Sequence, residues 1–294
     1  MFSLPNDNEQ VYTPLGRCLY CDNKDELGKE HVIAKSLGGR RILPRASCRA
    51  CGTMTSEFER TVARTMFGPM RMYFDIESRR RDERPDHLPL KVKLRADDEW
   101  SFINVERKIY PFLILFPLLS IPRELSGRSI EGDQLAKCAS FWTRAASFQS
   151  GVHEHLEMLA QSLNVAAIMP EGRADVDAFV RMLAKIGHAF ATAELENKSF
   201  RPSTIEIIRN AKASNALQFV GGSPHDEPQG STLHEIDFAY VRHDPTLVLV
   251  RIRLFAVLGA PSYFVAAGRS NDLEFVARSN PPLDAPVTGV RRVS

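Results

Sequence analysis

The feature that most restricts the fold of this sequence is a repeated Cys-x2-Cys spacing near its start. Cys18 and Cys21 form the first pair, Cys48 and Cys51 form the second, and 26 residues separate the two pairs. In a reducing compartment this arrangement indicates four ligands for one Zn²⁺ ion rather than a disulfide framework. Four thiolates in tetrahedral geometry leave no open coordination position. The predicted zinc ion is therefore structural.

The residues between and after the cysteine pairs have the pattern of two strands and a helix. The stretch KEHVIAKSLGG (29–39) begins with a Glu-His pair, continues as a short apolar strand and ends in a double-glycine turn. After the second pair, apolar residues recur at every fourth position, as on the buried face of a helix. These residues are Phe58, Val62, Met66 and Met70. The N-cap of this helix would be Thr53, Thr55 or Ser56.

With these motifs the chain resembles the HNH endonucleases. The resemblance rests on Cys-x2-Cys, then EHVIAKSLGG, then LPRASCRAC, and it covers roughly residues 15–65. HNH endonucleases are ββα-metal (His-Me finger) nucleases, and the similar variety carries a zinc-binding cysteine quartet. The resemblance implies His31 as general base and Glu30 as ligand of a catalytic Mg²⁺ or Mn²⁺ ion. It thereby implies hydrolysis of phosphodiester bonds, in DNA rather than RNA, and a role in antiviral defence or mobile-element biology of bacteria.

Two positions depart from the usual pattern of that family. Leu43 falls near a loop position that is usually Asn, and Gly52 follows the last cysteine, where the family usually has Asn or His as a second metal ligand. Glycine has no side-chain oxygen, so Thr55, Glu57, Glu59 or a water would have to replace that ligand. These departures keep an alternative open: a catalytically degenerate zinc protein that binds nucleic acid or docks onto a larger complex.

Basic residues are concentrated around the motif. The whole chain has a formal net charge of only +2, but residues 17–71 contain eleven Lys and Arg against six Asp and Glu. A basic region in a nearly neutral chain suits contact with a polyanion such as nucleic acid. The residues predicted to contact phosphates are Lys35, Arg40, Arg41, Arg45 and Arg49.

The remaining sequence predicts a second, larger domain. Residues 1–76 would form the zinc-stabilised domain, 77–87 an Arg-rich linker, and 88–294 a mixed helical and antiparallel-sheet domain, which makes the whole an α+β fold. Its role is undefined by sequence, and protein partners would bind through it. The predicted elements are strands within 88–119, one or two helices within 133–163, a helix over 175–197 and three antiparallel strands within 233–268.

Other candidate sites in the second domain are weak. Cys138 lies on an apolar helical stripe, which favours a core position. His153 and His155 would point to different faces of a helix and so would not share one ion, and His188 is interpreted as structural. The apolar segment 109–122 is interrupted by prolines and too short to span a bilayer, and the N-terminus lacks the apolar core of a signal peptide. The sequence thus predicts a cytoplasmic protein without a membrane partner.

Overall fold

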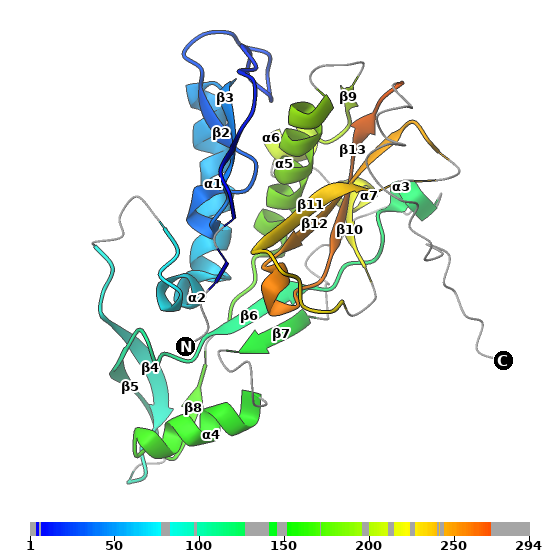
Figure 1. Cartoon of the computed structure of the whole chain (residues 1–294). Helices are drawn as coiled ribbons and strands as arrows, with labels where there is room; N and C mark the ends of the chain where they lie inside the picture. The colour runs from blue at the N-terminus through cyan, green and yellow to red at the C-terminus, as the bar shows by residue number, and fades with distance from the viewer. Residues whose placement is uncertain are drawn as a thin grey trace, which may run out of the picture.

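The computed structural model has the predicted α+β fold. It describes residues 4–5, 7–77, 83–96, 99–126, 141–145, 152–170, 172–195, 200–210, 215–223, 227–239, 241 and 244–271. Three groups of elements are visible in Figure 1: an N-terminal unit, a larger sheet crossed by a long helix, and a smaller sheet at the other end of the molecule.

The N-terminal unit has the expected order of strand, turn, strand and helix. Its central hairpin pairs β2 (Gly28–His31) with β3 (Arg41–Ser47) in antiparallel fashion, with His31 opposite Ile42. The other elements are β1 (Gln10–Val11), the 3₁₀ helix η1 (Lys35–Leu37), α1 (Arg49–Thr65) and α2 (Gly68–Tyr73). Gly38 ends η1 with φ of 92°, a left-handed conformation that glycine adopts without strain.

The helix after the second cysteine pair begins earlier than its sequence suggests. Its N-cap is Cys48 rather than Thr53, Thr55 or Ser56, so that prediction is wrong. Hydroxyls near the start of a helix can also hydrogen-bond to a carbonyl four residues earlier, and Thr53 Oγ1 does so at 3.0 Å from Arg49 O. The four apolar positions predicted for its inner face are all buried, but Met70 lies on α2, beyond a break before Pro69.

The larger sheet is the predicted antiparallel meander extended by two strands. Its strand order is β10-β13-β12-β11, and β9 pairs with β13. The strands are β9 (Arg201–Pro202), β10 (Val220–Gly222), β11 (His234–Ala239), β12 (Leu247–Leu254) and β13 (Tyr263–Arg269). Nearby are α6 (Ile205–Arg209), α7 (Ala216–Phe219) and the 3₁₀ helix η3 (Ala256–Leu258). The predicted helix is α5 (Val176–Leu195), which packs on β12 and β13.

The smaller sheet has the order β5-β4-β8 and is accompanied by α4. Its bounds are β4 (His87–Lys93), β5 (Trp100–Glu106), β8 (Ala167–Met169) and α4 (Val152–Ser162). A separate two-stranded antiparallel sheet pairs β6 (Leu113–Pro117) with β7 (Phe141–Ala145), and α3 (Arg123–Ser126) lies between them in sequence. Of the one or two helices predicted within 133–163, α4 is confirmed, but the prediction is wrong at 141–145, where aromatic and β-branched residues form a strand. Cys138 lies outside the described residues.

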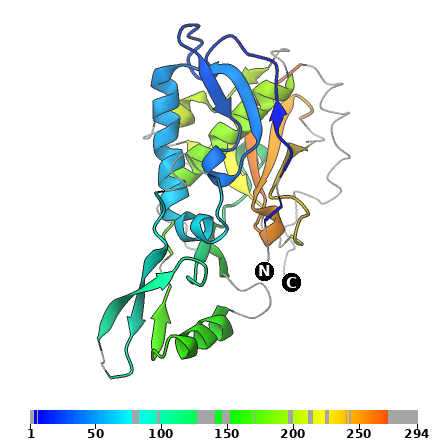
Figure 2. The ribbon, with the colours of Figure 1, turned by 60° about the vertical axis from the view of Figure 1, so that its left-hand side comes forward.

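One hydrophobic core joins the N-terminal unit to the larger sheet. It contains buried residues from the segments that carry the four N-terminal cysteines, from α1 and α5, and from the sheet. Helix α1 packs directly against α5. Figures 1 and 2 show α5 between α1 and the sheet. The strand β4, which follows the predicted linker, belongs to the smaller sheet, and its buried residues form a separate hydrophobic core. In the part of the chain that the structure describes, we find no helix with the length and apolar character that crossing a bilayer requires.

Candidate metal centre and the buried lysine beside it

The four N-terminal cysteines meet at one point. Cys18 and Cys21 lie on the turn before β2, Cys48 caps α1 and Cys51 lies in its first turn. Their sulfur atoms all lie within 4.8 Å of one another, and Cys21 Sγ is 3.7 Å from Cys48 Sγ. Zn–S bonds of about 2.3 Å in a tetrahedron place sulfurs about 3.8 Å apart. The quartet thus fits a closed Zn²⁺ site, as the spacing predicted, and the sulfurs are too far apart for disulfides.

The protein surroundings act differently on the individual thiols of the quartet. Cys18, Cys48 and Cys51 are buried, and Cys21 is exposed. A backbone hydrogen bond from Cys51 lowers the pKa of the Cys48 thiol to about 7. Burial raises the pKa of Cys18 and Cys51, so a bound cation is what would keep these two deprotonated.

His31 is the last residue of β2, and its side chain is partly buried. Burial, and after it the positive charge of Lys185, lower the pKa of His31 below its ordinary value. The imidazole is therefore neutral near pH 7, which is the protonation state that a general base needs.

Glu30, the predicted ligand of a catalytic metal, forms an ion pair with a buried lysine. Glu30 is 7% exposed, and its Oε1 lies 2.8 Å from Nζ of Lys185, a residue of α5 that is fully buried. Glu59 Oε1, from α1, also lies 2.8 Å from this Nζ. The ammonium donates hydrogen bonds to the backbone carbonyls of His31 and Val32 as well. Two carboxylate oxygens and two carbonyl oxygens thus surround one cation.

The charges of this cluster favour a protonated lysine. Burial alone lowers the pKa of Lys185, but Glu30 and Glu59 outweigh it and raise the pKa above its ordinary value. Burial also raises the pKa of Glu59, and the charge of Lys185 opposes this shift. Sequence patterns did not single out Lys185. The available signal was that Lys185 and His188 are the sole titratable residues of the otherwise uncharged stretch 182–193.

The side chains proposed to replace the metal ligand missing at Gly52 lie in different surroundings. Thr55 is buried and its hydroxyl donates to Gly52 O at 3.3 Å, whereas Glu57 is exposed. Glu59 is the one that lies close to Glu30, because both carboxylates form ion pairs with Lys185. Leu43 is buried on β3 opposite Glu30. Among the described residues, the cysteine quartet is the one group of three or more His, Cys, Asp or Glu with the geometry to hold a metal ion.

Three of the five predicted phosphate-contacting residues have partners within the chain. Lys35 and Arg40 approach the carboxylate of Glu77 at 2.8 and 3.6 Å. The guanidinium of Arg41 lies 5.1 Å from the ring centroid of Phe190, a cation–π contact with α5.

The other two, Arg45 and Arg49, are exposed beside the cysteine quartet. Arg49 also lines a shallow cleft together with Cys48 and residues of the loop 23–26. These two arginines are thus the cations of the predicted set with the most open surroundings.

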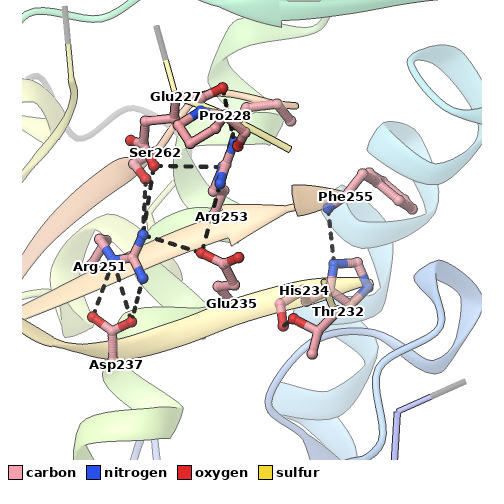
Figure 3. A network of polar contacts seen from close by, with 11 residues as sticks. Glu227, Pro228, Thr232, His234, Glu235, Asp237, Arg251, Arg253, Phe255 and Ser262 are labelled. Atoms are coloured by element: carbon pink, nitrogen blue, oxygen red, sulfur yellow. Dashed lines mark hydrogen bonds and ion pairs between the residues drawn. The ribbon is translucent and has the colours of Figure 1, made fainter. Parts of the chain in front are cut away.

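A second polar cluster, unpredicted from sequence, lies on the larger sheet (Figure 3). Arg251 forms a close ion pair with Asp237 at 2.6 Å. Arg253 is buried and donates to the carbonyls of Ala260 at 2.6 Å and Glu227 at 3.3 Å. These bonds attach the loop before β11 and the connection between β12 and β13 to the sheet. We assign this network a structural role.

Two histidines connect the N-terminal unit to the rest of the molecule. His188 Nε2 lies 2.9 Å from Leu19 O, and His234 Nε2 lies 2.9 Å from Leu37 O. His234 Nδ1 accepts the backbone N–H of Phe255 at 3.2 Å, as Figure 3 shows. This bond requires the neutral ring with its proton on Nε2. The interpretation of His188 as structural agrees with its burial, whereas the side chains of His153 and His155 lie outside the described residues.

Acidification is expected to destabilise the protein through these two rings. Burial lowers the pKa of both His188 and His234 to about 4, below the unfolded value of 6.5. The stability they contribute is therefore complete above pH 6.5 and is lost as the pH falls toward 4, on the order of 3 kcal/mol for the fully buried His188 and less for His234. Urea unfolding at a series of pH values measures this.

The double variant His188→Gln/His234→Gln separates this effect from acid release of zinc. Its free energy of unfolding should vary less between pH 6.5 and 4 than that of the wild type, while the zinc content stays equal. Equal pH dependence of the two proteins would contradict the assignment.

Comparison with known proteins identifies no relative from which a function can be transferred. No protein-family model matches this chain. Searches of curated proteins and of solved structures likewise find no significant match.

Proposed function

We propose that this chain is a zinc-stabilised nucleic-acid-binding protein whose ββα unit binds phosphates without hydrolysing them. The observation that carries the proposal is the position of Lys185. Its ammonium is enclosed by Glu30, Glu59 and the carbonyls of His31 and Val32. An all-oxygen environment of this kind is what a hard divalent cation such as Mg²⁺ prefers. A fixed internal ammonium therefore takes the place of the exchangeable ion that hydrolysis would require.

The same lysine differs from a catalytic cation in its access to substrate. A metal ion that assists hydrolysis must keep coordination positions for a phosphate oxygen and for water. Lys185 is fully buried, and its contacts are oxygens of the protein itself. It can neutralise Glu30, but it offers no position for a phosphate.

Nucleic-acid binding is supported by the charge around the zinc site. Arg45 and Arg49 are exposed next to the cysteine quartet, in the region with eleven basic and six acidic residues. Contacts of arginine to phosphates position a nucleic acid without reading its sequence. We therefore expect sequence-independent binding of duplex DNA that weakens steeply with salt.

The second candidate function is hydrolysis of DNA, with His31 as general base and Mg²⁺ or Mn²⁺ bound near Glu30. One observation favours it: the lowered pKa of His31, which keeps its ring neutral near pH 7. This function requires Lys185 to leave the carboxylates when substrate and metal arrive.

A plasmid assay separates the two functions. Supercoiled plasmid is incubated with wild type or His31→Ala in Mg²⁺ or Mn²⁺, and duplex binding is measured at the same salt concentrations. The proposal expects no nicking by either protein and intact salt-sensitive binding by both. Nicking by the wild type that His31→Ala abolishes would instead establish the enzyme.

Removing the two exposed arginines is expected to weaken duplex binding. Each phosphate contact contributes about 0.9 to the slope of log affinity against log salt, so Arg45→Asn/Arg49→Gln should reduce that slope by about 1.8. Asparagine is chosen because residue 45 has φ of 49°, which asparagine tolerates. The matched control is Arg209→Gln, which removes an exposed cation on α6. Equal slopes for the double variant and the control would refute this interface.

A further inference from the structure

Two basic residues of the N-terminal unit share one acidic partner. Lys35 lies on η1, and Arg40 directly precedes β3. Nζ of Lys35 lies 2.8 Å from Oε1 of Glu77, and a guanidinium nitrogen of Arg40 lies 3.6 Å from Oε2 of the same carboxylate. Each carboxylate oxygen therefore faces one cation. A phosphate group, which also offers several anionic oxygens to lysine and arginine, suits the same pair of cations.

The backbone beside Glu77 is fixed to the N-terminal unit. Ile76, the residue before it, is buried in the core shared with the larger sheet. A Cβ atom added at Gly38 would lie 3.8 Å from Cγ2 of Ile76, so this side chain packs beside the turn that separates Lys35 from Arg40. The anchored backbone thus presents the carboxylate of Glu77 to both cations.

The three charged side chains are themselves accessible to solvent. The exposed fractions are 47% for Lys35, 31% for Arg40 and 46% for Glu77. Ion pairs between exposed side chains contribute little to stability, because water and salt screen them. Rotation of the Glu77 side chain can therefore release both cations while the backbone stays in place.

We propose that Lys35 and Arg40 form a phosphate site of the duplex interface, and that Glu77 occupies this site in the free protein. The proposal rests on the proposed nucleic-acid binding and adds a second contact to the surface of Arg45 and Arg49. A backbone phosphate of the DNA displaces the carboxylate, which turns toward solvent. Glu77 is thus an internal competitor that lowers the affinity of the protein for DNA.

The position of the two cations suits a duplex that also reaches the zinc site. Arg40 and Arg45 are five residues apart in the sequence, which corresponds to at most about 17 Å at about 3.4 Å per strand residue. A DNA strand also rises about 3.4 Å per nucleotide, so about five base pairs cover that separation. One duplex slightly longer than a helical turn, about 12 base pairs, can therefore contact both places at once.

The same two cations suit a duplex better than a free phosphate ion. Both lie on the surface, so a single ion would have to be captured from water by two solvated charges. A duplex brings a dense row of phosphates and releases condensed counterions when cations bind it, which favours association. The phosphate that replaces the carboxylate of Glu77 therefore belongs to DNA.

Removing the charge of Glu77 is expected to strengthen duplex binding. Glu77→Gln keeps the shape of the side chain, and the affinity of the full-length protein for a labelled duplex of about 12 base pairs should rise about fivefold. Fluorescence anisotropy at about 0.15 M salt measures this. The matched control Glu9→Gln removes an exposed carboxylate beside β1, which pairs with the start of β3. It should change the affinity less than about twofold, because salt screens its field over about 8 Å.

A double-mutant cycle assigns the gain to the shared ion pairs. In a Lys35→Gln/Arg40→Gln background, Glu77→Gln should raise the affinity no more than Glu9→Gln does, because the site for which Glu77 competes is absent. Relative to Glu77→Gln alone, Lys35→Gln/Arg40→Gln/Glu77→Gln should lose about 1.8 from the slope of log affinity against log salt, about 0.9 for each phosphate contact. All four side chains are exposed or partly exposed, and thermal unfolding checks that each variant is folded.

Three outcomes would overturn the proposal. One is a duplex affinity of Glu77→Gln equal to that of the wild type or of Glu9→Gln. A second is an equal gain from Glu77→Gln with and without Lys35 and Arg40. A third is tighter binding of inorganic phosphate by Glu77→Gln in calorimetry without any gain in duplex affinity, which would make the pair a site for the free ion.

These outcomes differ from a failure of the proposed function. In each of them the wild type still binds duplex through Arg45 and Arg49. If the proposed function fails, neither the wild type nor Glu77→Gln binds duplex at low salt, and the competition by Glu77 is refuted together with it. Duplex binding by Glu77→Gln that far exceeds binding by the wild type would confirm the competition.

Discussion

Replacing Lys185 with methionine is expected to reduce the free energy of unfolding by about 3–5 kcal/mol at pH 7, the usual effect of removing one partner from a buried ion pair. The variant leaves the carboxylates of Glu30 and Glu59 buried without a cation, although methionine fills much of the same volume. Urea unfolding measures the loss. The matched control is Lys29→Met, which removes an exposed lysine one residue from Glu30 and should change stability by less than about 0.5 kcal/mol.

The pH dependence of this loss identifies its cause. Burial already raises the pKa of Glu59 above its unfolded value, and removal of Lys185 raises it further. A carboxyl group with a raised pKa in the folded state destabilises that state at high pH and ceases to do so once it is protonated. The deficit of Lys185→Met should therefore shrink as the pH falls from 7 toward the unfolded pKa. A deficit that is independent of pH would contradict an electrostatic origin.

Two further variants test whether Lys185 stands in for a cation. The triple variant Glu30→Gln/Glu59→Gln/Lys185→Met contains no unpaired charge and should recover much of the lost stability. In Lys185→Ala the ammonium is absent while both carboxylates remain, so Mn²⁺ should raise the melting temperature of this variant and not that of the wild type. Equal responses to Mn²⁺ would show that the carboxylates alone do not form a cation site.

Loss of the zinc ion is expected to have a still larger effect. Apparent binding free energies for structural zinc are about 10–16 kcal/mol in zinc-finger peptides, which is comparable with the whole stability of a typical domain, about 5–15 kcal/mol. Cys48→Ser should therefore abolish zinc binding and leave the N-terminal unit unfolded. Elemental analysis measures zinc per chain, and limited proteolysis reports unfolding within residues 17–66. The matched control Cys138→Ser removes the cysteine outside the quartet and should retain the metal.

The hydrophobic core shared by the N-terminal unit and the larger sheet leads to a second expected effect of zinc loss. Because α1 packs on α5 and one hydrophobic core joins both units, loss of zinc should also lower the melting temperature of the larger sheet. Retained zinc in Cys48→Ser would refute the four-thiolate site. An unchanged melting transition of the larger sheet would instead show that the stability of the two units is not coupled through the shared core.

The sequence alone determined those features that depend on neighbouring residues. The first Cys-x2-Cys pair lies on a turn and the second at the start of α1, and each presents two sulfurs, so the quartet could be predicted from spacing. The apolar periodicity of 175–197 and the turns within 233–268 determined a helix and an antiparallel meander, because burial of a continuous face is decided within each element. Spacing misjudged 141–145, where pairing with β6 decided for a strand.

Tertiary structure decided what Glu30 contacts. Glu30 lies on β2 and its partner Lys185 lies more than 150 positions along the chain on α5, and the two elements both pack against α1. The fold also places Arg41 of β3 against Phe190 of α5, whereas Arg45 and Arg49 are exposed. No local pattern encodes these contacts, since each depends on which elements share a core. Sequence spacing thus determined the zinc site, whereas the fold determined that the neighbouring carboxylates of Glu30 and Glu59 are paired with Lys185.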